Sequence, residues 1–496
     1  MAPGILLASA SEQDFDQRPS KRIRSSFSPQ AGECQSDDDN IPTHPLEIKP
    51  SGNAYSSHVN SKHNAGVFAA LPDELTLQLL ETLPATGLVA LGSSCRFLYA
   101  FTQYDELWRA LFVASQPADF EWLGTWRATY LKLPPNTWSK IPCPNVYSDV
   151  LHRPFFCTHT SLKKYAQNIP RQNLIARLDD LSFEEYSAKW TNQPFILTNP
   201  VKQWPAAQKW NIDYLLKHYA ETLFRAEAVD WPFKKYVSYM NNSQDESPLY
   251  LFDREFVEKM NIEVGKESEN AMYWPPECFG EDLFDVLGDQ RPDRRWLIIG
   301  PERSGSTFHK DPNATSAWNA PLTGSKYWLM FPSGPDVPPP PGVILSEDQS
   351  EITSPLSIAE YLLSFHEIAR ATPGCREGIC YAGEILHVPS GWFHLVLNLE
   401  ESIALTQNFV PAARLTQVLR FLRDTPDHVS GFRDEVTDPY GLFVSKLQEK
   451  YPDLLEKALK QLDGKKGKWE QVKEVKQESA EGGGFSFGFD SDDEED

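Results

Sequence analysis

The stretch GEILHVPSGWFHLVLNL (residues 383–399) contains two apolar runs that are separated by the turn residues 389–391. Short apolar runs bounded by Pro, Ser and Gly are typical of buried β-strands joined by a tight turn. The pattern therefore predicts two neighbouring strands. His387 and His394 flank the turn, which also makes this stretch a candidate part of a functional site.

Short β-type runs of the same kind recur from residue 193 to residue 410. They are QPFILTNP (193–200), LFRAEAV (223–229), SPLYLFD (247–253), RRWLIIG (294–300), STFHKDP (306–312), SKYWLMFP (325–332) and SIALTQNFV (402–410). Many short strands broken by Gly and Pro indicate a β-sandwich or barrel. Helical patterns at 206–220 and after Pro411 flank this region, and residues 333–354 are interpreted as an extended Pro-rich surface insertion.

The run STFHKDP places an imidazole and a carboxylate at alternate positions. In a strand, side chains two residues apart point to the same face, so we expect His309 and Asp311 to project together while Lys310 faces away. These are two of the three ligands in the 2-His-1-carboxylate arrangement, which holds non-haem Fe(II) and leaves other coordination positions open. By itself an H-x-D pair has low specificity, because solvent-facing strands also carry such residues.

A complete site of this type needs a second histidine from a distant strand. The downstream histidines are His366, His387, His394 and His428. His366 lies in a helical pattern and His428 in a turn-like one. His394 begins an apolar run typical of a buried barrel strand, so it is the preferred ligand. His387 is interpreted as a core residue or as a neighbour of the ligands.

Two longer stretches carry a resemblance to a known family. GPERSGSTFHKDPNATSAWNAPLTGSKYWLMFP (300–332) followed by GEILHVPSGWFHLVLNLEESIALTQNFV (383–410) resembles the JmjC-domain oxygenases, in particular the lysyl-hydroxylase/arginine-demethylase branch once known as the phosphatidylserine receptor. The resemblance extends upstream through YMNNSQDESPLYLFD and RRWLIIGPERSG. It implies a mainly β double-stranded β-helix, a jelly-roll or cupin-like barrel, with flanking helices.

The resemblance assigns the metal-binding and catalytic residues, because His309, Asp311 and His394 match the iron ligands of the family. It implies Fe(II), 2-oxoglutarate and O₂, with the barrel supplying position, dryness and orientation for their chemistry. Hydroxylation of a side-chain carbon gives a stable product, whereas hydroxylation of an N-methyl group releases formaldehyde and amounts to demethylation. Both outcomes use the same iron site, so the choice between hydroxylase and demethylase stays open.

Four further residues match cosubstrate contacts of the family. Lys326 matches the lysine that pairs with the C5 carboxylate of 2-oxoglutarate, and an ammonium suits that anion in a dry pocket. Tyr250 and Thr406 match hydroxyl donors to the same carboxylate, and Asn319 matches an amide beside the cosubstrate. Taken singly, Tyr250 also suits a core, Asn319 a turn and Lys326 a solvated strand. Their joint occurrence at the family spacing favours the binding site.

The sequence LPDELTLQLLETLPATGLVALGSSCRFLYAFTQYDELWRALF (71–112) predicts a small all-α unit. Pro72 suits a first helical turn, and Leu75, Leu79 and Leu83 recur with helical spacing. Three short helices bury little surface by themselves, so such a unit often completes itself against a partner. The stretch resembles an F-box, which implies binding to the Skp-type adaptor of a cullin ubiquitin ligase. The alternative is a small helical domain without that partner.

Three functions are compatible with these patterns. The leading hypothesis is an Fe(II)- and 2-oxoglutarate-dependent protein oxygenase, a hydroxylase or N-methyl demethylase, coupled to an F-box. The alternative is a substrate adaptor of an SCF-type ubiquitin ligase that uses the JmjC barrel mainly for binding. A cupin-like small-molecule enzyme is disfavoured by the F-box. The complete ligand set with Lys326 favours the oxygenase, since a pure binding module does not need all of these residues.

The composition limits the partners. A formal net charge of −22 over 496 residues disfavours a nucleic-acid-binding surface, because phosphate binding needs clustered Lys and Arg, and it favours a basic protein substrate. No segment approaches the ~20 apolar residues that span a bilayer, so no membrane partner is expected. The 7 scattered cysteines are typical of a reducing compartment.

Together these patterns divide the chain into six parts. They are a disordered N-terminal arm (1–66), the F-box (67–115), a linker packed on the barrel (116–180), the JmjC domain (181–412, with the Pro-rich insertion at 333–354), C-terminal helices (413–476) and an acidic disordered tail (477–496). The C-terminal helices either brace the barrel or form a homodimer surface. The basic cluster KRIR (21–24) suits a nuclear import signal, so the nucleus is the expected location and the cytoplasm the alternative.

Overall fold

The computed structural model describes residues 41–462 apart from 118, 134–139, 267–269, 335, 347–351 and 354–355. The chain forms two compact units. The larger contains the described residues up to Gly280 together with Asp293–Phe409, and the smaller contains Glu281–Pro292 and the described residues from Val410 onward. The predicted acidic tail (477–496) and the basic cluster at 21–24 lie outside the described residues.

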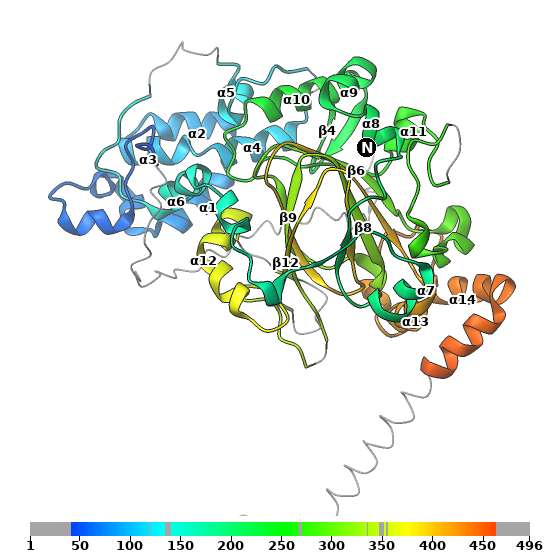
Figure 1. The fold of residues 1–496 in the computed structure, drawn as a ribbon. Helices are drawn as coiled ribbons and strands as arrows, with labels where there is room; N and C mark the ends of the chain where they lie inside the picture. Colours follow the sequence, from blue (N-terminus) through cyan, green and yellow to red (C-terminus); the bar gives the residue numbers. More distant parts are fainter. Residues whose placement is uncertain are drawn as a thin grey trace, which may run out of the picture. The chain divides into compact units, whose positions relative to one another are not determined.

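Two β-sheets form the centre of the larger unit and make a cupin-like barrel (Figure 1). The large sheet has the order β1-β2-β13-β8-β15-β6-β5-β3-β4, and the small sheet has the order β12-β9-β14-β7. Neighbouring strands are antiparallel except for β1 and β2. The mainly β barrel with flanking helices that the sequence predicts is therefore confirmed. The strands of these sheets are β1 (Ala176–Leu178), β2 (Phe195–Leu197), β3 (Leu223–Ala226), β4 (Val229–Pro232), β5 (Leu251–Asp253), β6 (Arg295–Gly300), β7 (Gly305–His309), β8 (Ser316–Thr323), β9 (Ser325–Phe331), β12 (Arg376–Tyr381), β13 (Ile385–Val388), β14 (Phe393–Asn398) and β15 (Ser402–Phe409).

The stretch at 383–399 forms strands β13 and β14 on either side of a turn, as its pattern predicts. The two strands do not pair with each other, because β13 joins the large sheet and β14 the small one. The turn therefore crosses from one sheet to the other. Every residue of β14 and of its neighbour β9 is buried, which explains their continuous apolar runs.

Strands β8 and β12 are among those that have no counterpart in the sequence prediction. Strand β8 contains Asn319 and Pro321, which are depleted in strands, and β12 begins with Arg376 and Glu377. Both strands are held by pairing on the neighbouring strands rather than by their own propensity. Inside the predicted Pro-rich insertion, β10 (Ile344–Leu345) and β11 (Ile352–Thr353) pair as a short antiparallel hairpin.

The F-box-like region contains four helices rather than the predicted three: α1 (Asp73–Glu81), α2 (Ala85–Gly92), α3 (Arg96–Thr102) and α4 (Asp105–Ser115). In α1 the buried apolar residues are Leu77 and Leu80. Leu75 and Leu79, which have the helical spacing noted in the sequence, are 46% and 48% exposed. The side chains of Leu75 and Leu79 are therefore exposed in the described chain, as expected of a surface that binds a partner protein.

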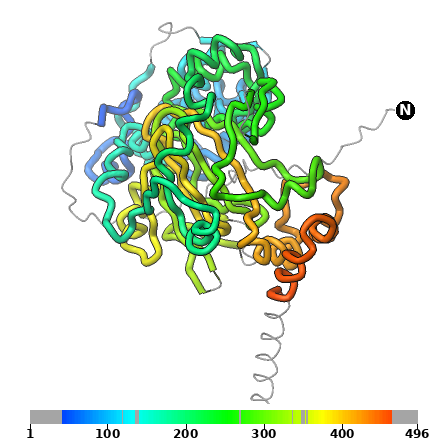
Figure 2. Tube along the Cα trace, turned by 45° about the vertical axis from the view of Figure 1, so that its right-hand side comes forward, coloured from blue at the N-terminus to red at the C-terminus, as the bar shows by residue number. Residues whose placement is uncertain are grey.

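The prediction of a disordered arm over 1–66 is wrong for residues 41–66. This segment forms the 3-10 helices η1 (Ser51–Ser56) and η2 (Ser61–Asn64), and it buries Leu46 and Ile48. The two side chains supply the apolar contacts that hold it, although its overall composition is polar. Figure 2 shows the segment in dark blue near the cyan residues around 150, and Lys49 forms a β-bridge with Tyr147.

Residues 116–180 are less irregular than predicted. They include α5 (Trp126–Leu131), α6 (Asp149–His159) and strand β1, which pairs with β2 at the edge of the large sheet. Trp122 and Trp126 of this segment pack into an aromatic cluster, since the Trp126 ring lies 5.1 Å from that of Trp122, 5.4 Å from that of Phe112 in α4 and 5.9 Å from that of Trp231 in β4. The F-box-like helices and the barrel therefore share one hydrophobic core.

The remaining helices of the larger unit surround the sheets. They are α7 (Phe183–Glu185), α8 (Pro205–Lys209), α9 (Ile212–Tyr219), α10 (Phe233–Asn241), α11 (Phe256–Met260) and α12 (Ile358–Ala371). Helix α12 packs on the small sheet, where its Tyr361 ring lies 5.1 Å from the Phe308 ring of β7.

The smaller unit is helical, as predicted for the region after Pro411. It contains α13 (Leu415–Asp424), α14 (Pro439–Lys450), a further helix at 452–462 and the 3-10 segment η8 (Leu283–Gln290). The Phe443 ring of α14 packs on Phe284 of η8 at 4.8 Å. Across the residues that the structure describes, no helix is long and apolar enough to cross a membrane.

Candidate active site

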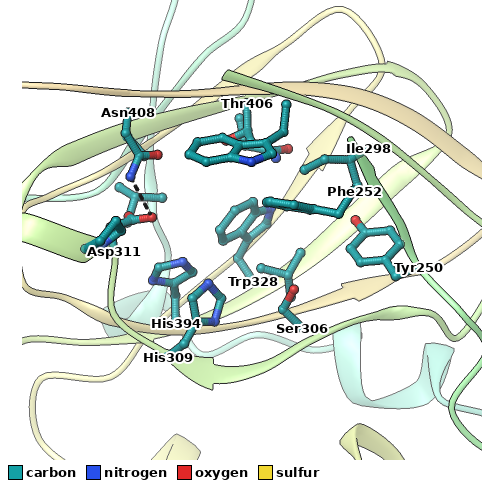
Figure 3. A pocket seen from close by; sticks show the side chains of 16 residues that line it. Tyr250, Phe252, Ile298, Ser306, His309, Asp311, Trp328, His394, Thr406 and Asn408 are labelled. Carbon is teal, nitrogen blue, oxygen red and sulfur yellow. Dashed lines mark hydrogen bonds between the residues drawn. The ribbon is translucent and has the colours of Figure 1, made fainter. Parts of the chain in front are cut away.

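A pocket opens between the two sheets of the barrel (Figure 3). Three strands of the small sheet and five of the large sheet contribute to its wall, so side chains far apart in the sequence meet there. The lining residues are Tyr250, Phe252, Trp296, Ile298, Ser306, His309, Asp311, Pro312, Ala317, Asn319, Trp328, Val388, His394, Val396, Thr406 and Asn408. Of the seven site residues predicted from the sequence, only Lys326 is absent from the wall.

His309 and His394 face each other across the paired strands β7 and β14, with their ring centroids 4.1 Å apart. Each ring is oriented by the carbonyl two residues earlier: His309 Nδ1 lies 2.8 Å from Thr307 O, and His394 Nδ1 lies 3.1 Å from Trp392 O. A ring that donates from Nδ1 keeps Nε2 as the nitrogen that can bind a metal.

The charge state of the two rings suits that role. The pKa of both His309 and His394 is lowered to about 4, mainly by burial and, in His309, also by the neighbouring imidazole. Both rings are therefore neutral near pH 7, as metal binding requires, and no proton has to leave them first.

Asp311 lies just beyond the end of β7, in extended backbone with φ −63° and ψ 148°. The alternation predicted for this run therefore continues past the strand. Lys310 turns to the other face, where its ammonium lies 5.0 Å from the centre of the Phe393 ring. The Oδ1 atom of Asp311 accepts a long hydrogen bond from Asn408 Nδ2 at 3.4 Å, whereas its Oδ2 atom is buried without a hydrogen-bond partner.

The three side chains do not form a closed ligand cluster as they stand. Among the described residues, no group of three His, Cys, Asp or Glu side chains is already arranged to hold a metal ion. The donor chemistry nevertheless fits Fe(II), because two oriented imidazoles and a carboxylate oxygen without a partner share one pocket. Burial also raises the pKa of Asp311 above its usual range, a cost that a bound cation would remove.

Lys326 lies in β9 and is 0% exposed. Its ammonium donates to Tyr250 Oη at 2.6 Å and to Asn398 Oδ1 at 2.8 Å, and both partners are neutral. Burial lowers the pKa of Lys326 to about 7. A buried amine with neutral partners is an incomplete ion pair, which an anionic ligand in the pocket would complete.

Thr406 and Asn319 pair directly across strands β15 and β8. The Thr406 hydroxyl donates to Trp318 O at 2.8 Å, and Asn319 Oδ1 is buried without a hydrogen-bond partner. Asn319 therefore belongs to a strand, not to the turn that the sequence left open. Its free oxygen, like that of Asp311, is a polar atom with room for a ligand.

The pocket also contains polar residues that the sequence analysis did not single out. Ser306 lies on β7 and is part of the pocket wall that the small sheet forms. Asn408 lies two residues after Thr406, on the same face of β15. The period-2 pattern in SIALTQNFV was the signal that would have found Asn408. His387 is fully buried among aromatic rings, 4.8 Å from that of Phe195, and contributes to the core as expected.

The barrel, its pocket and the helical module before it define the class of protein. Residues 181–414 match the cupin-like domain family, and residues 68–114 match the F-box-like family. The chain belongs to the family of JmjC-type cupin-like proteins that carry an F-box-like domain.

Several characterised proteins are similar to this chain. Arginine-specific demethylase JMJ22 of Arabidopsis thaliana is 38% identical over 440 residues, which cover 86% of this chain and 85% of that protein. The bifunctional arginine demethylase and lysyl-hydroxylase psr-1 of Caenorhabditis elegans is 34% identical over 58% of this chain and 71% of its own length. The 2-oxoglutarate and iron-dependent oxygenase JMJD4 of Danio rerio is 28% identical over 47% of this chain and 59% of that protein.

Proposed function

We propose that this protein is an Fe(II)- and 2-oxoglutarate-dependent protein oxygenase in which His309, Asp311 and His394 hold the iron. The observation that carries the proposal is the donor set of the pocket: two neutral imidazoles oriented through Nδ1 and a carboxylate oxygen without a partner. Relatives that are named as 2-oxoglutarate and iron-dependent oxygenases support the same activity.

The other polar residues of the pocket would bind the cosubstrate. The ammonium of Lys326 would pair with the C5 carboxylate of 2-oxoglutarate, with the Tyr250 hydroxyl beside it. Asn319 and Thr406 would supply polar contacts on the large-sheet side of the pocket. When bound, Fe(II) with 2-oxoglutarate and O₂ supplies oxidation of a C–H bond, with release of succinate and CO₂. The apolar wall residues Phe252, Ile298 and Val396 exclude water from this chemistry.

The proposed substrate is a basic protein segment with an N-methylated arginine or an unmodified lysine. The names of JMJ22 and psr-1 support this class, and the net charge of −22 favours basic partners. Mass spectrometry of a basic peptide separates the two reactions, because demethylation removes a methyl group and releases formaldehyde whereas hydroxylation adds one oxygen.

A second function is proposed for the F-box-like region, which would bind a Skp-type adaptor. Leu75, Leu79 and Val89 form the observation in its favour, because each is at least 45% exposed on α1 or α2. Double substitution of Leu75 and Leu79 by Asp should abolish co-purification with the adaptor and leave the melting temperature unchanged. Co-purification that survives the double substitution would contradict this assignment.

Two expectations from the sequence extend the proposal. The basic cluster at 21–24 would direct the protein to the nucleus, with the cytoplasm as the alternative. The helices after Pro411, α13 and α14 among them, would support a homodimer, the alternative being that they brace the barrel. Sedimentation of the purified protein tests the second expectation, and a monomer at all concentrations would contradict it.

The activity is tested by succinate formation from 2-oxoglutarate with purified protein and Fe(II). The wild-type protein should form succinate, and the rate should increase when a substrate peptide is added. His394→Ala should reduce the rate at least 100-fold, because a ligand of the metal is lost. Glu302→Gln, at an exposed surface ion pair with Lys163, is a matched control and should retain full activity.

A further inference from the structure

The last helix of the F-box-like module reaches into the barrel unit through a buried arginine. Arg109 of α4 is 9% exposed, and its Nη2 atom donates to Glu227 Oε2 at 2.9 Å. Its Nη1 atom donates to the backbone oxygen of Ser247 at 3.3 Å. Both partners belong to the cupin-like domain, more than a hundred residues downstream in the chain. A side chain of the F-box-like module thus contacts the two segments that precede strand β5.

Glu227 occupies an unusual position for its residue type. It is the first residue of the two-residue turn between Ala226 and Val229, which pair across β3 and β4. Its φ of 50° lies in the left-handed region, where such turns normally place Gly, Asn or Asp. Its side chain is nevertheless buried and uses both oxygens: Oε2 accepts from Arg109, and Oε1 accepts from the backbone N–H of Tyr250 at 3.2 Å. The carboxylate therefore links Arg109 to Tyr250.

Tyr250 needs such a link because it lies outside the sheet. It directly precedes β5, so its N–H has no partner strand and is held by the Glu227 side chain instead. The neighbouring residues are fixed in the same way: the Leu249 N–H donates to Tyr239 Oη at 2.7 Å, and the Leu251 N–H donates to Tyr236 Oη at 3.2 Å. Side chains therefore position Leu249 and Tyr250, and Leu251 is also held by strand pairing with Ala226 and Ile299.

The position of this segment decides where the Tyr250 phenol lies in the pocket. The phenol oxygen receives the 2.6 Å hydrogen bond of the Lys326 ammonium. A shift of the Tyr250 backbone would move the hydroxyl away from the ammonium that is proposed to bind the C5 carboxylate. A displacement of about 1 Å is enough to affect binding geometry in an active site.

We propose that Arg109 is a positioning residue for the cosubstrate pocket, which holds the Tyr250 backbone through Glu227 and thereby aligns the Tyr250 hydroxyl with Lys326. This inference rests on the proposed function. It makes the F-box-like module part of the oxygenase and not only a docking site for an adaptor. In this proposal Arg109 contacts neither the cosubstrate nor the metal. Because it acts through the position of the Tyr250 hydroxyl, its substitution should change the affinity for 2-oxoglutarate.

The test is the steady-state kinetics of succinate formation with varied 2-oxoglutarate. Arg109→Met should raise the KM for 2-oxoglutarate about five- to tenfold and change kcat less than about twofold. Glu227→Gln retains the side-chain volume and loses the ion pair, so its KM should rise about threefold. Glu74→Gln is the matched control, because Glu74 is an exposed carboxylate on helix α1 of the same module and is not a partner of Arg109. It should leave both constants unchanged.

A double-mutant cycle separates positioning from general destabilisation. In a Tyr250→Phe background the hydroxyl is already absent, so Arg109→Met should raise KM less than about twofold further. Additive effects of the two substitutions would overturn the inference. If Arg109→Met does not fold, the same cycle with Glu227→Gln decides. Wild-type turnover combined with unchanged KM values in the folded variants would refute this inference alone, whereas absence of turnover in the wild type would refute the proposed function.

Discussion

Replacement of Lys326 by Met tests whether this buried amine is present to bind an anion. The ammonium is fully buried, and its hydrogen-bond partners Tyr250 and Asn398 are neutral. Burial lowers the pKa of Lys326 from its usual 10.5 to about 7. In the absence of 2-oxoglutarate the protonated side chain therefore destabilises the folded protein.

The magnitude follows from the two pKa values. An unfolded chain keeps the Lys326 proton up to about pH 10.5, whereas the folded chain releases it near pH 7, so the free energy of unfolding rises with pH between these values. The penalty relative to a neutral side chain is about 4 kcal/mol at pH 7 and about 2 kcal/mol at pH 9. Lys326→Met lacks this penalty but leaves the Tyr250 and Asn398 oxygens without their donor, a cost that does not depend on pH in this range.

The assay is urea unfolding of the wild type and of Lys326→Met at pH 7 and pH 9, without cosubstrate. The difference in free energy of unfolding should move in favour of the wild type by about 2 kcal/mol as the pH rises. In turnover, the variant should raise the KM for 2-oxoglutarate about 100-fold, because a buried charge pair is lost. A difference that is independent of pH, together with an unchanged KM, would refute the reasoning.

Three further predictions follow from particular contacts. Fe(II) affinity should fall as the pH drops from 7 to 5, because burial raises the pKa of Asp311 above its usual range and protons then compete with the metal for this carboxylate. An anaerobic titration that shows the same affinity at both pH values would contradict this. Gly300→Ala should raise the KM for 2-oxoglutarate several-fold without unfolding the protein, because a Cβ atom at residue 300 would clash with Ser304 Oγ and lie 2.6 Å from the Tyr250 ring. An unchanged KM would argue against this packing beside the Tyr250 ring. Phe112→Ala should lower the free energy of unfolding by about 3–5 kcal/mol, because the Phe112 ring packs on Trp126 in the shared core. A loss below about 1 kcal/mol in urea unfolding would mean that the F-box-like module is not part of that core.

Much of the site could be predicted from local patterns. The period-2 alternation of STFHKDP predicted that His309 and Asp311 would share a face, and the structure places both in the pocket although β7 ends at His309. The apolar run after residue 391 selected His394 over the other histidines, and it lies opposite His309. These inferences depend on neighbours within one strand, which a sequence displays directly.

Other features depend on contacts between distant segments, which no local pattern contains. Strand β8 has a proline and polar residues, so only its pairing with β13 and β15 defines it as a strand. The link from Arg109 to Glu227 joins a helix to a hairpin turn that is remote in the chain. The order in residues 41–66 depends on two buried side chains, Leu46 and Ile48, in an otherwise polar segment. In each case, tertiary packing outweighed composition or propensity.

The central claim is that this pocket binds Fe(II) and 2-oxoglutarate together. Anaerobic titration of the purified protein with Fe(II) and 2-oxoglutarate, followed through the visible charge-transfer absorption of the chelated iron, tests it most directly. The wild type should bind a single equivalent of each, and His309→Ala and Asp311→Ala should lose the absorption while remaining folded. Absence of binding in the wild type, or equal binding in all three proteins, would contradict the assignment of the site.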